Sequence, residues 1–235
     1  MNADRKLLED IFEWDVVNWS VAIDFWKNHL HVPLNGAQVL EIGAHNGGLS
    51  LWLALQGANV ICSDARDPVD RGLNKHKRYG VTDKISYEKI DARHIPYKDY
   101  FDIVVFKSLL GGVRGYHGDD AHFQVISSIL KSLKPGGQLL FAENLEGSSI
   151  HRYARKQFVA WGDFWKYLKI SELPSLFVEF TAVEFMTCGF TGSFGRKEWQ
   201  RRILGCLDKR IFAKFLPPSW RYIAIGVATK ARRKD

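Results

Sequence analysis

Apolar residues recur along the chain at two spacings, one typical of amphipathic helices and one typical of buried strands. Between residues 7 and 30 the helical spacing predicts one or two amphipathic helices before the first strand. Short apolar runs then alternate with helical segments, which predicts a mostly parallel sheet with helices on both faces. The predicted strands are 37–43, 58–64, 84–91, 101–108, 137–144, 177–185 and 221–230, and the helices between them are 47–57, 68–79 and 119–133.

Length and composition fit one α/β domain with insertions, because 235 residues with 46% hydrophobic content can bury a full core. We expect a single domain over residues 1–235 with four parts. These are an N-terminal helical cap (1–35), a ligand-binding core (36–145), and two substrate, lid or dimer elements (146–176 and 189–219).

The three cysteines lie far apart, which predicts neither a disulfide framework nor a CxxC site and fits a reducing cytoplasm. The N-terminal stretch has no apolar export signal, and no run approaches the roughly 18 apolar residues of a membrane span. We therefore expect a cytoplasmic protein.

Charge divides the chain into two unequal parts. Residues 150–235 carry 17 Lys and Arg against 7 Asp and Glu, a balance of +10, whereas residues 1–149 carry 16 against 19, a balance of −3. A basic part can meet nucleic acid, an anionic membrane face or an anionic substrate, or it can be a solvated surface without a partner.

The stretch LEIGAHNGGLS, residues 40–50, joins the first predicted strand to the next helix. In an open parallel sheet, ligands bind at the carboxyl ends of the strands, and Gly43 and Gly47 would let the backbone approach a ligand there. Asp64 closes the second strand 21 positions after Gly43, where it can accept hydrogen bonds from both hydroxyls of a ribose. The loop lacks the GxGxxG spacing of a pyrophosphate site, so it indicates an adenosine-bearing cofactor in general terms.

Five stretches follow one another in a characteristic order: VLEIGAHNGGLSLWLA, VICSDA, ISYEKIDARHIP, FDIVVFKS and LKPGGQLLFAEN. They resemble the successive motifs of class I S-adenosylmethionine-dependent methyltransferases over about residues 36–145, with a final strand at 221–229. The resemblance implies a Rossmann-like three-layer α/β/α sandwich. Its seven-stranded sheet would have one reversed strand, N-terminal helices and a helical insertion between the last two strands.

The resemblance also implies how S-adenosylmethionine would lie. It would cover the loop from Gly43 to Gly47, with Asp64 on the ribose, Asp91 near the adenine and Glu41 supporting the loop. His45 stands where the family usually has a glycine, which disfavours a dinucleotide. Asp64 can also be an ordinary strand-end carboxylate, and Asp91 can be a helix N-cap. The expected cofactor residues are Glu41, Gly43, Ala44, His45, Gly47, Asp64, Ala65, Asp91, Ala92 and Lys107, and no metal is expected.

Transfer of a methyl group to a hydroxyl requires in-line positioning and a base. The candidates lie in the loops after the fourth and fifth predicted strands, where histidine is the residue suited to proton transfer near neutral pH. We favour His151 over His117, with Glu143 orienting the base or the substrate. Each histidine can instead be structural, and Glu143 can cap the next helix. The same loops also contain Lys107, Ser108 and Asn144.

Residues 151–169 interleave cations with aromatic side chains. Such a segment can stack on bases along a phosphate track or on sugar rings beside an anionic group, or it can pack as an amphipathic helix. The insertion at 189–219 is expected to form a lid, a homodimer contact or a membrane-surface patch. The aromatic residues of the first segment are Tyr153, Phe158, Trp161, Phe164, Trp165 and Tyr167.

The stretches FAENLEGSSIHRYARK and LPPSWRYIAIGVATK are among those that resemble bacterial methyltransferases of polysaccharide and O-antigen synthesis. This resemblance favours a sugar hydroxyl on a glycan, glycolipid or other phosphorylated carbohydrate, with the basic part of the chain at the inner membrane face. One alternative is a nucleic-acid (RNA) methyltransferase, although no appended RNA-binding module is evident. Others are a non-catalytic binding protein with this fold and, less favoured, a nicotinamide dehydrogenase.

Overall fold

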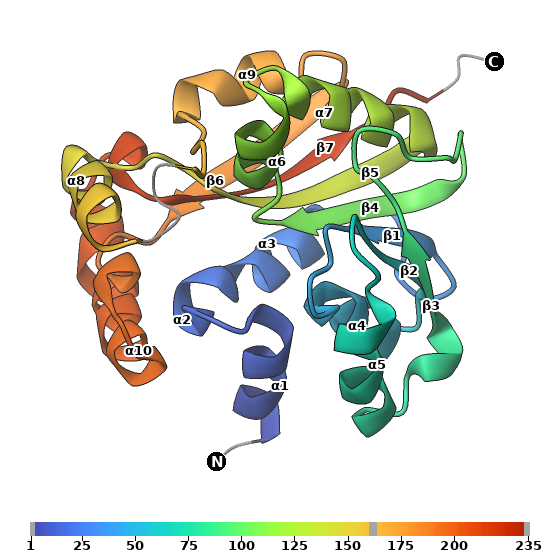
Figure 1. The fold of residues 1–235 in the computed structure, drawn as a ribbon, viewed down its shortest axis with the longest axis horizontal. Helices are drawn as coiled ribbons and strands as arrows, with labels where there is room; N and C mark the ends of the chain where they lie inside the picture. Colours follow the sequence, from blue (N-terminus) through green and yellow to red (C-terminus); the bar gives the residue numbers. More distant parts are fainter. Residues whose placement is uncertain (1–2, 160–163, 233–235) are drawn as a thin grey trace.

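Seven strands form one sheet in the order β3-β2-β1-β4-β5-β7-β6 (Figure 1). The structure, a computed structural model, describes residues 3–159 and 164–232. The strands are β1 (Gln38–Ile42), β2 (Asn59–Asp64), β3 (Ile85–Lys89), β4 (Phe101–Lys107), β5 (Leu133–Asn144), β6 (Ala182–Cys188) and β7 (Ile223–Thr229).

The pairing confirms the predicted fold class. Strands β3, β2, β1, β4 and β5 run parallel, and β7 runs antiparallel to both β5 and β6. The parallel strands therefore end at one edge of the sheet, where the loops after β1, β2 and β4 meet. The side chains of the central strands β1, β4 and β5 are mostly buried, as expected for strands covered on both faces, whereas those of the edge strand β3 are mostly half-buried or exposed.

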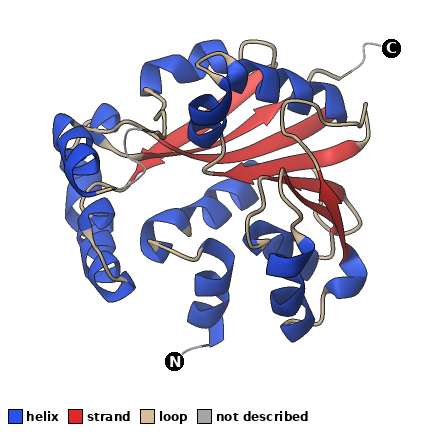
Figure 2. Cartoon of the chain, viewed as in Figure 1, coloured by secondary structure: helices blue, strands red, loops and turns tan. Residues whose placement is uncertain are grey.

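Helices cover both faces of the sheet and complete the Rossmann-like sandwich (Figure 2). One buried cluster joins the N-terminal helices and α4 to the sheet, and a second joins α6, α7 and α9 to the opposite face. The α-helices are α1 (Ala3–Phe12), α2 (Val16–Trp19), α3 (Val21–His29), α4 (Gly48–Leu55), α5 (Val69–Arg78), α6 (Leu110–His117), α7 (Ala121–Ser132), α8 (Ser149–Phe158), α9 (Leu173–Leu176), α10 (Glu198–Leu207) and α11 (Ala213–Phe215).

The N-terminal segment departs from the one or two helices predicted for it. It forms three, because the chain turns sharply between α1 and α2, where Glu13 and Asp15 have φ angles of 69° and 46°. The N–H groups of Asp15 and Val16 donate to the carboxylate of Glu198 on α10, so a distant residue caps the start of α2. The apolar pattern alone could not reveal this break.

Helix α6 occupies a segment that the sequence indicated as a loop. Its start is fixed by the Glu143 carboxylate, which accepts hydrogen bonds from the N–H groups of Leu109 and Leu110 at 2.8 and 2.7 Å. Glycine at 111 lets the indole of Trp165 approach the helix, since a Cβ there would lie 2.0 Å from the indole nitrogen. Its glycines argue against a helix by propensity, and tertiary contacts override that preference.

The two insertions are only partly the elements predicted. Helix α8 ends at Phe158, and Trp161 lies outside the described residues, while the segment from Phe164 onward packs on α6. The strand predicted at 177–185 begins later, at Ala182. The insertion between β6 and β7 is helical, as expected, and contains α10 and α11 joined by a π-helical turn at Asp208–Phe212. Within the described ranges, the helices are too short or too polar to cross a membrane.

Candidate functional site

A cavity of about 850 Å³ opens where β1, β2 and β4 end, between α1 and α6. It gathers nearly all of the residues expected to hold a cofactor. Gly47 does not line it, although its neighbour Gly48 does. The expected cofactor residues on its wall are Glu41, Gly43, Ala44, His45, Asp64, Ala65, Asp91, Ala92 and Lys107.

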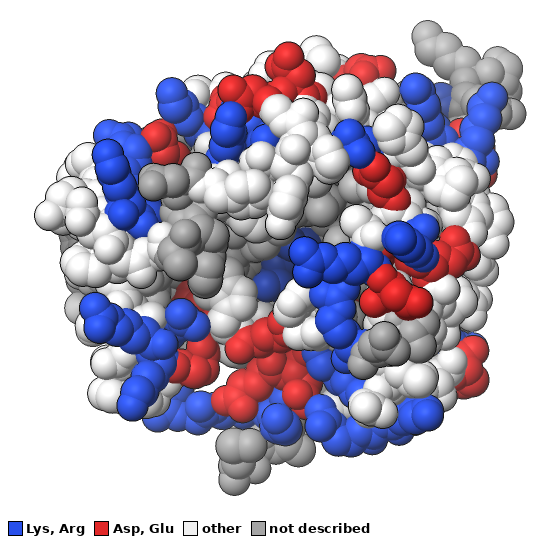
Figure 3. All heavy atoms as spheres, viewed as in Figure 1, with Lys and Arg blue, Asp and Glu red and all other residues white. Residues whose placement is uncertain are grey.

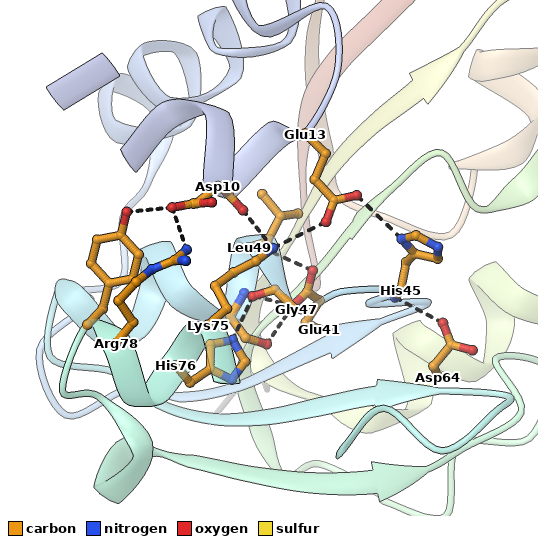
Figure 4. A network of polar contacts seen from close by, with 12 residues as sticks. Asp10, Glu13, Glu41, His45, Gly47, Leu49, Asp64, Lys75, His76 and Arg78 are labelled. Atoms are coloured by element: carbon orange, nitrogen blue, oxygen red, sulfur yellow. Dashed lines mark hydrogen bonds and ion pairs between the residues drawn. The ribbon is translucent and has the colours of Figure 1, made fainter. Parts of the chain in front are cut away.

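The loop between β1 and α4 requires its two glycines. Gly43 and Gly47 have φ angles of 69° and 68°, a region in which side chains are strained. A Cβ on Gly47 would lie 2.6 Å from Cε1 of His76, whose Nε2 lies 2.8 Å from the Gly47 carbonyl oxygen (Figure 4). Close packing from α5 thus holds the loop in the shape that exposes its backbone to the cavity.

Glu41 supports this loop from beneath. Its buried carboxylate accepts hydrogen bonds from the N–H groups of Leu49 and Ser50, at 3.2 and 2.7 Å, and from the Ser50 hydroxyl. Burial raises the pKa of Glu41 to about 7. A carboxylate placed on the first N–H groups of α4 stabilises the helix start, so Glu41 both lines the cavity and fixes the loop above it.

Asp64 and His45 connect the loops after β2 and β1 (Figure 4). The His45 N–H donates to Oδ2 of Asp64 at 3.0 Å, and the Arg66 N–H donates to Oδ1 at 3.0 Å. The imidazole points toward Glu13, with Nδ1 and Oε2 3.4 Å apart, and remains largely exposed. The loop therefore tolerates a histidine, because the His45 ring points toward Glu13 while the His45 N–H hydrogen-bonds to Asp64.

Asp91 lies at the cavity wall after β3 rather than capping a helix. Its carboxylate accepts hydrogen bonds from the N–H and the guanidinium of Arg93, the shortest at 2.6 Å. These side-chain hydrogen bonds lower the pKa of Asp91. The pair leaves a charged rim beside the buried Ala92.

Lys107, the last residue of β4, brings an ammonium group into the cavity wall. Its Nζ lies 5.3 and 5.0 Å from the ring centroids of Trp14 and Trp19, within the range of cation–π attraction. Burial lowers the pKa of Lys107 to about 8, although surrounding carboxylates oppose the shift. At physiological pH most Lys107 side chains are therefore charged, and a minor fraction is neutral.

Ser108 and His117 also line the cavity, from the turn after β4 and the end of α6. Ser108 has a φ angle of 53°, and its hydroxyl accepts a hydrogen bond from the side-chain amide of Asn144 at 2.7 Å. Asn144 thereby acts behind the wall, while the exposed His117 faces the opening.

The structure does not bring His151 and Glu143 to the wall of this cavity, as far as the described residues define it. His151 is buried, with Nε2 donating to the Phe190 carbonyl and Nδ1 accepting from the Ser148 hydroxyl, both at 2.8 Å. Burial lowers its pKa. Glu143 caps α6, and burial raises its pKa to about 7. Both candidates occupy structural positions here, because every polar atom has a partner within the fold.

Sequence reasoning missed the contribution of the N-terminal helices. Ile11, Glu13 and Trp14 line the cavity, and Trp165 reaches it from the segment after β5. Lys75 on α5 donates to Glu13 at 3.2 Å and to the Asp10 carbonyl at 2.8 Å, which ties α1 to the core. The amphipathic pattern at residues 7–30 indicated a helix but carried no signal for its place over the cavity.

Residues 40–141 match the family model described as a methyltransferase domain. Among curated proteins, the chain is 31% identical over 116 residues to the methyltransferase GfsG of Streptomyces halstedii, covering 46% of this chain and 38% of that one. It is 27% identical to the ubiquinone/menaquinone biosynthesis C-methyltransferase UbiE of Idiomarina loihiensis, covering 60% of this chain and 61% of that one. The chain thus spans less than two thirds of these relatives.

Solved structures show the same fold. Phosphoethanolamine N-methyltransferase 2 of Haemonchus contortus, in complex with S-adenosyl-L-methionine, superposes with a TM-score of 0.65 at 17% identity, over 91% of this chain and 53% of that one. An S-adenosylmethionine-dependent methyltransferase of Methanosarcina mazei gives 0.62 at 16% identity, over 88% and 97%. The molecule thus has the Rossmann-like fold seen in S-adenosylmethionine-dependent methyltransferases. The match to the family model covers the part of this fold from residue 40 to residue 141.

Proposed function

We propose that this chain is an S-adenosylmethionine-dependent methyltransferase that binds S-adenosyl-L-methionine and releases S-adenosyl-L-homocysteine. The observation that carries the proposal is the cavity, which places the glycine loop, Asp64 and Asp91 along one wall at the ends of β1, β2 and β3. The methyltransferase match over residues 40–141 and solved neighbours holding the cofactor or its product support the same assignment.

The cofactor's adenosine belongs over β2 and β3. Asp64 would accept hydrogen bonds from the ribose hydroxyls, and Asp91 and Ala92 would hold the adenine. Its methionine part then extends along the loop at 43–47 toward β4. The cofactor has no phosphate, so the loop needs close backbone approach but no pyrophosphate cradle, which suits a histidine at position 45.

Bound S-adenosylmethionine would supply an electrophilic methyl group, whose bond to sulfur would break as its bond to the acceptor forms, so that the positive charge on sulfur would be lost. A hydroxyl acceptor must also lose a proton, and Lys107 and His117, which line the cavity at the end of β4 and on α6, are placed to take it. Lys107 suits this role because its pKa of about 8 leaves a neutral fraction at physiological pH. His151 and Glu143 act at most through the fold that they hold together.

The acceptor we favour is a sugar hydroxyl on a glycan, glycolipid or other phosphorylated carbohydrate. The resemblance to polysaccharide-associated methyltransferases and the +10 balance of residues 150–235 support it. Aromatic walls at Trp14, Tyr116 and Trp165 suit the apolar face of a sugar ring. The similar proteins include a C-methyltransferase and an N-methyltransferase, so they differ among themselves in the kind of atom that is methylated.

A methyl-transfer assay tests this function. The protein is incubated with S-adenosylmethionine labelled in its methyl group and with nucleotide sugars, lipid-linked glycans, quinols or RNA. We expect label in the carbohydrate fractions, with transfer lost in Asp64→Ala. Label in RNA or quinol alone would overturn the acceptor while keeping the enzyme class, and transfer equal in wild type and Asp64→Ala would overturn the site.

A further inference from the structure

The insertion between β6 and β7 has an apolar outer face. Residues 198–215 are helical throughout, and every fourth residue carries an exposed apolar side chain. Residues spaced by four lie next to one another along a helix, so these side chains form one continuous row. We call this row the apolar stripe: Trp199, Ile203, Leu207, Ile211 and Phe215, which are 54, 52, 39, 46 and 79% exposed.

The inner face of the same helix makes its own contacts with the core, so the stripe is not needed to hold the helix there. Asp208 is buried and accepts hydrogen bonds from the N–H groups of residues 190–192 at 2.7 to 3.0 Å, and from the Asn18 side chain at 3.0 Å. Glu198 caps α2. These polar contacts anchor the insertion to the core together with Phe212, whose ring centroid lies 5.7 Å from that of Phe190. The five residues of the stripe face outward and take no part in this anchoring.

Cations flank the stripe. Between residues 196 and 215 the exposed charged side chains are all basic, because Glu198 and Asp208 are held within the fold. Three of the cations, at 202, 210 and 214, each precede a stripe residue by one position. In Figure 3, Lys and Arg atoms gather among uncharged atoms at the lower left, over α10. The exposed cations are Arg196, Lys197, Arg202, Lys209, Arg210 and Lys214.

We propose that residues 196–215 bind the surface of a membrane containing anionic lipids, with the apolar stripe among the acyl chains and the flanking cations at the headgroups. Apolar side chains on one face with Lys and Arg beside them are the arrangement that interfacial helices use. The long stems of Arg and Lys let their charges reach the headgroups while the stripe is buried.

Other occupants fit this surface less well. A second copy placed across a two-fold axis would bring the six cations of each copy together, and like charges repel. RNA would meet the cations, but the aliphatic side chains at 203, 207 and 211 cannot stack on bases. An anionic bilayer matches both the charge and the apolar row.

Vesicle flotation tests the inference without any methyl acceptor, so its failure and that of the proposed enzyme activity are distinguishable. We expect the protein to float with phosphatidylcholine vesicles containing phosphatidylglycerol and to stay behind with phosphatidylcholine alone. Ile211→Ser with Phe215→Ser should weaken partitioning at least about tenfold. Arg210→Gln with Lys214→Gln should weaken it about 30-fold, from roughly 1 kcal/mol for each cation at the membrane surface.

The matched control replaces two apolar residues of similar exposure elsewhere, Phe123→Ser (44%) with Val178→Ser (77%), and should bind vesicles as wild type does. Circular dichroism and thermal unfolding check that each variant is folded. If the apolar variant fails to fold, the charge variant still tests the inference. Absence of wild-type flotation, equal loss in control and stripe variants, or a dimer or RNA complex broken by the stripe variant would overturn the inference.

Discussion

Residues 41–50, around the loop between β1 and α4, and the carboxylate cluster of Asp15, Glu198 and Asp208 both place carboxyl groups against main-chain N–H groups, but over different distances along the chain. Each region holds one buried carboxyl group, Glu41 or Asp208, on main-chain N–H groups, because a buried polar group requires hydrogen-bond partners. In the loop, Glu41 finds its donors eight and nine positions along the chain. In the cluster, Glu198 caps residues 183 and 182 positions away. Hydrogen bonds between residues close in sequence leave a motif that can be recognised in the sequence, whereas hydrogen bonds between distant residues do not.

The two regions therefore differ in what a substitution should change. The loop shapes a ligand site, and damage to it should appear first in binding. The cluster joins the N-terminal helices to the late insertion, and damage to it should appear first in stability.

Replacing Asp208 should have the largest effect. Asp208→Ala leaves several buried donors unpaired, and we expect a loss of about 3 to 5 kcal/mol in the free energy of unfolding. Urea denaturation followed by circular dichroism measures it. Asp208→Asn keeps one acceptor oxygen and should lose clearly less. A loss below about 1 kcal/mol for Asp208→Ala would mean that the cluster does not join the two regions.

Replacing Asp64 should weaken ligand binding next most strongly. We expect Asp64→Ala to weaken S-adenosylmethionine binding by about 1 to 3 kcal/mol, because hydrogen bonds to a charged group are lost. Calorimetric titration measures this, and stability should change little compared with Asp208→Ala. Weaker binding with little change in stability would distinguish the loop from the carboxylate cluster. Unchanged affinity would show that Asp64 does not bind the ribose.

The pH dependence of stability should show whether Asp15 is protonated in the folded protein. Burial raises the pKa of Asp15 to about 7, with Glu198 and Asp208 adding to the shift and Tyr222 and Asn18 opposing it. The native state thus favours the protonated acid, so its stabilisation is complete below about pH 4 and is lost as pH rises through 7.

Asp15→Asn should accordingly flatten the fall in unfolding free energy between pH 5 and 7, by up to about 1.4 kcal/mol per pH unit. Denaturation series at fixed ionic strength measure the slope. Glu41 and Glu143, whose pKa values are also raised to about 7, keep their contributions in both proteins. Parallel curves for the variant and wild type would show that Asp15 is ionised throughout.

Replacing His45 should have the smallest effect. His45→Gly keeps the N–H that donates to Asp64 and relieves a side chain at a φ angle of 50°. We expect S-adenosylmethionine affinity within about threefold of wild type, a difference under about 0.7 kcal/mol. A tenfold loss would show that the imidazole itself contacts the ligand.

The sequence was sufficient for the sheet and for the place of Gly43 and Asp64 at one cavity, because strand spacing, strand ends and glycine turns follow local rules. It was insufficient for catalytic candidates. His151 and Glu143 follow a strand just as a functional residue would, yet long-range partners at Phe190 and Leu110 engage them. The cover of the cavity by α1 likewise depends on contacts between distant segments.

Localisation in the cytoplasm and association of the chain with itself stay predictions, and the vesicle experiment bears on the membrane face alone. The proposed methyl transfer, whatever its acceptor, depends on the binding of S-adenosylmethionine.

Calorimetric titration of the purified protein with S-adenosylmethionine and S-adenosylhomocysteine, with NAD as the control, tests that claim most directly. We predict micromolar binding of both sulfur nucleosides at one site and no binding of NAD. Binding of NAD, or silence from both sulfur nucleosides with a folded protein, would contradict the account and favour a protein that has kept the fold without the methyl donor.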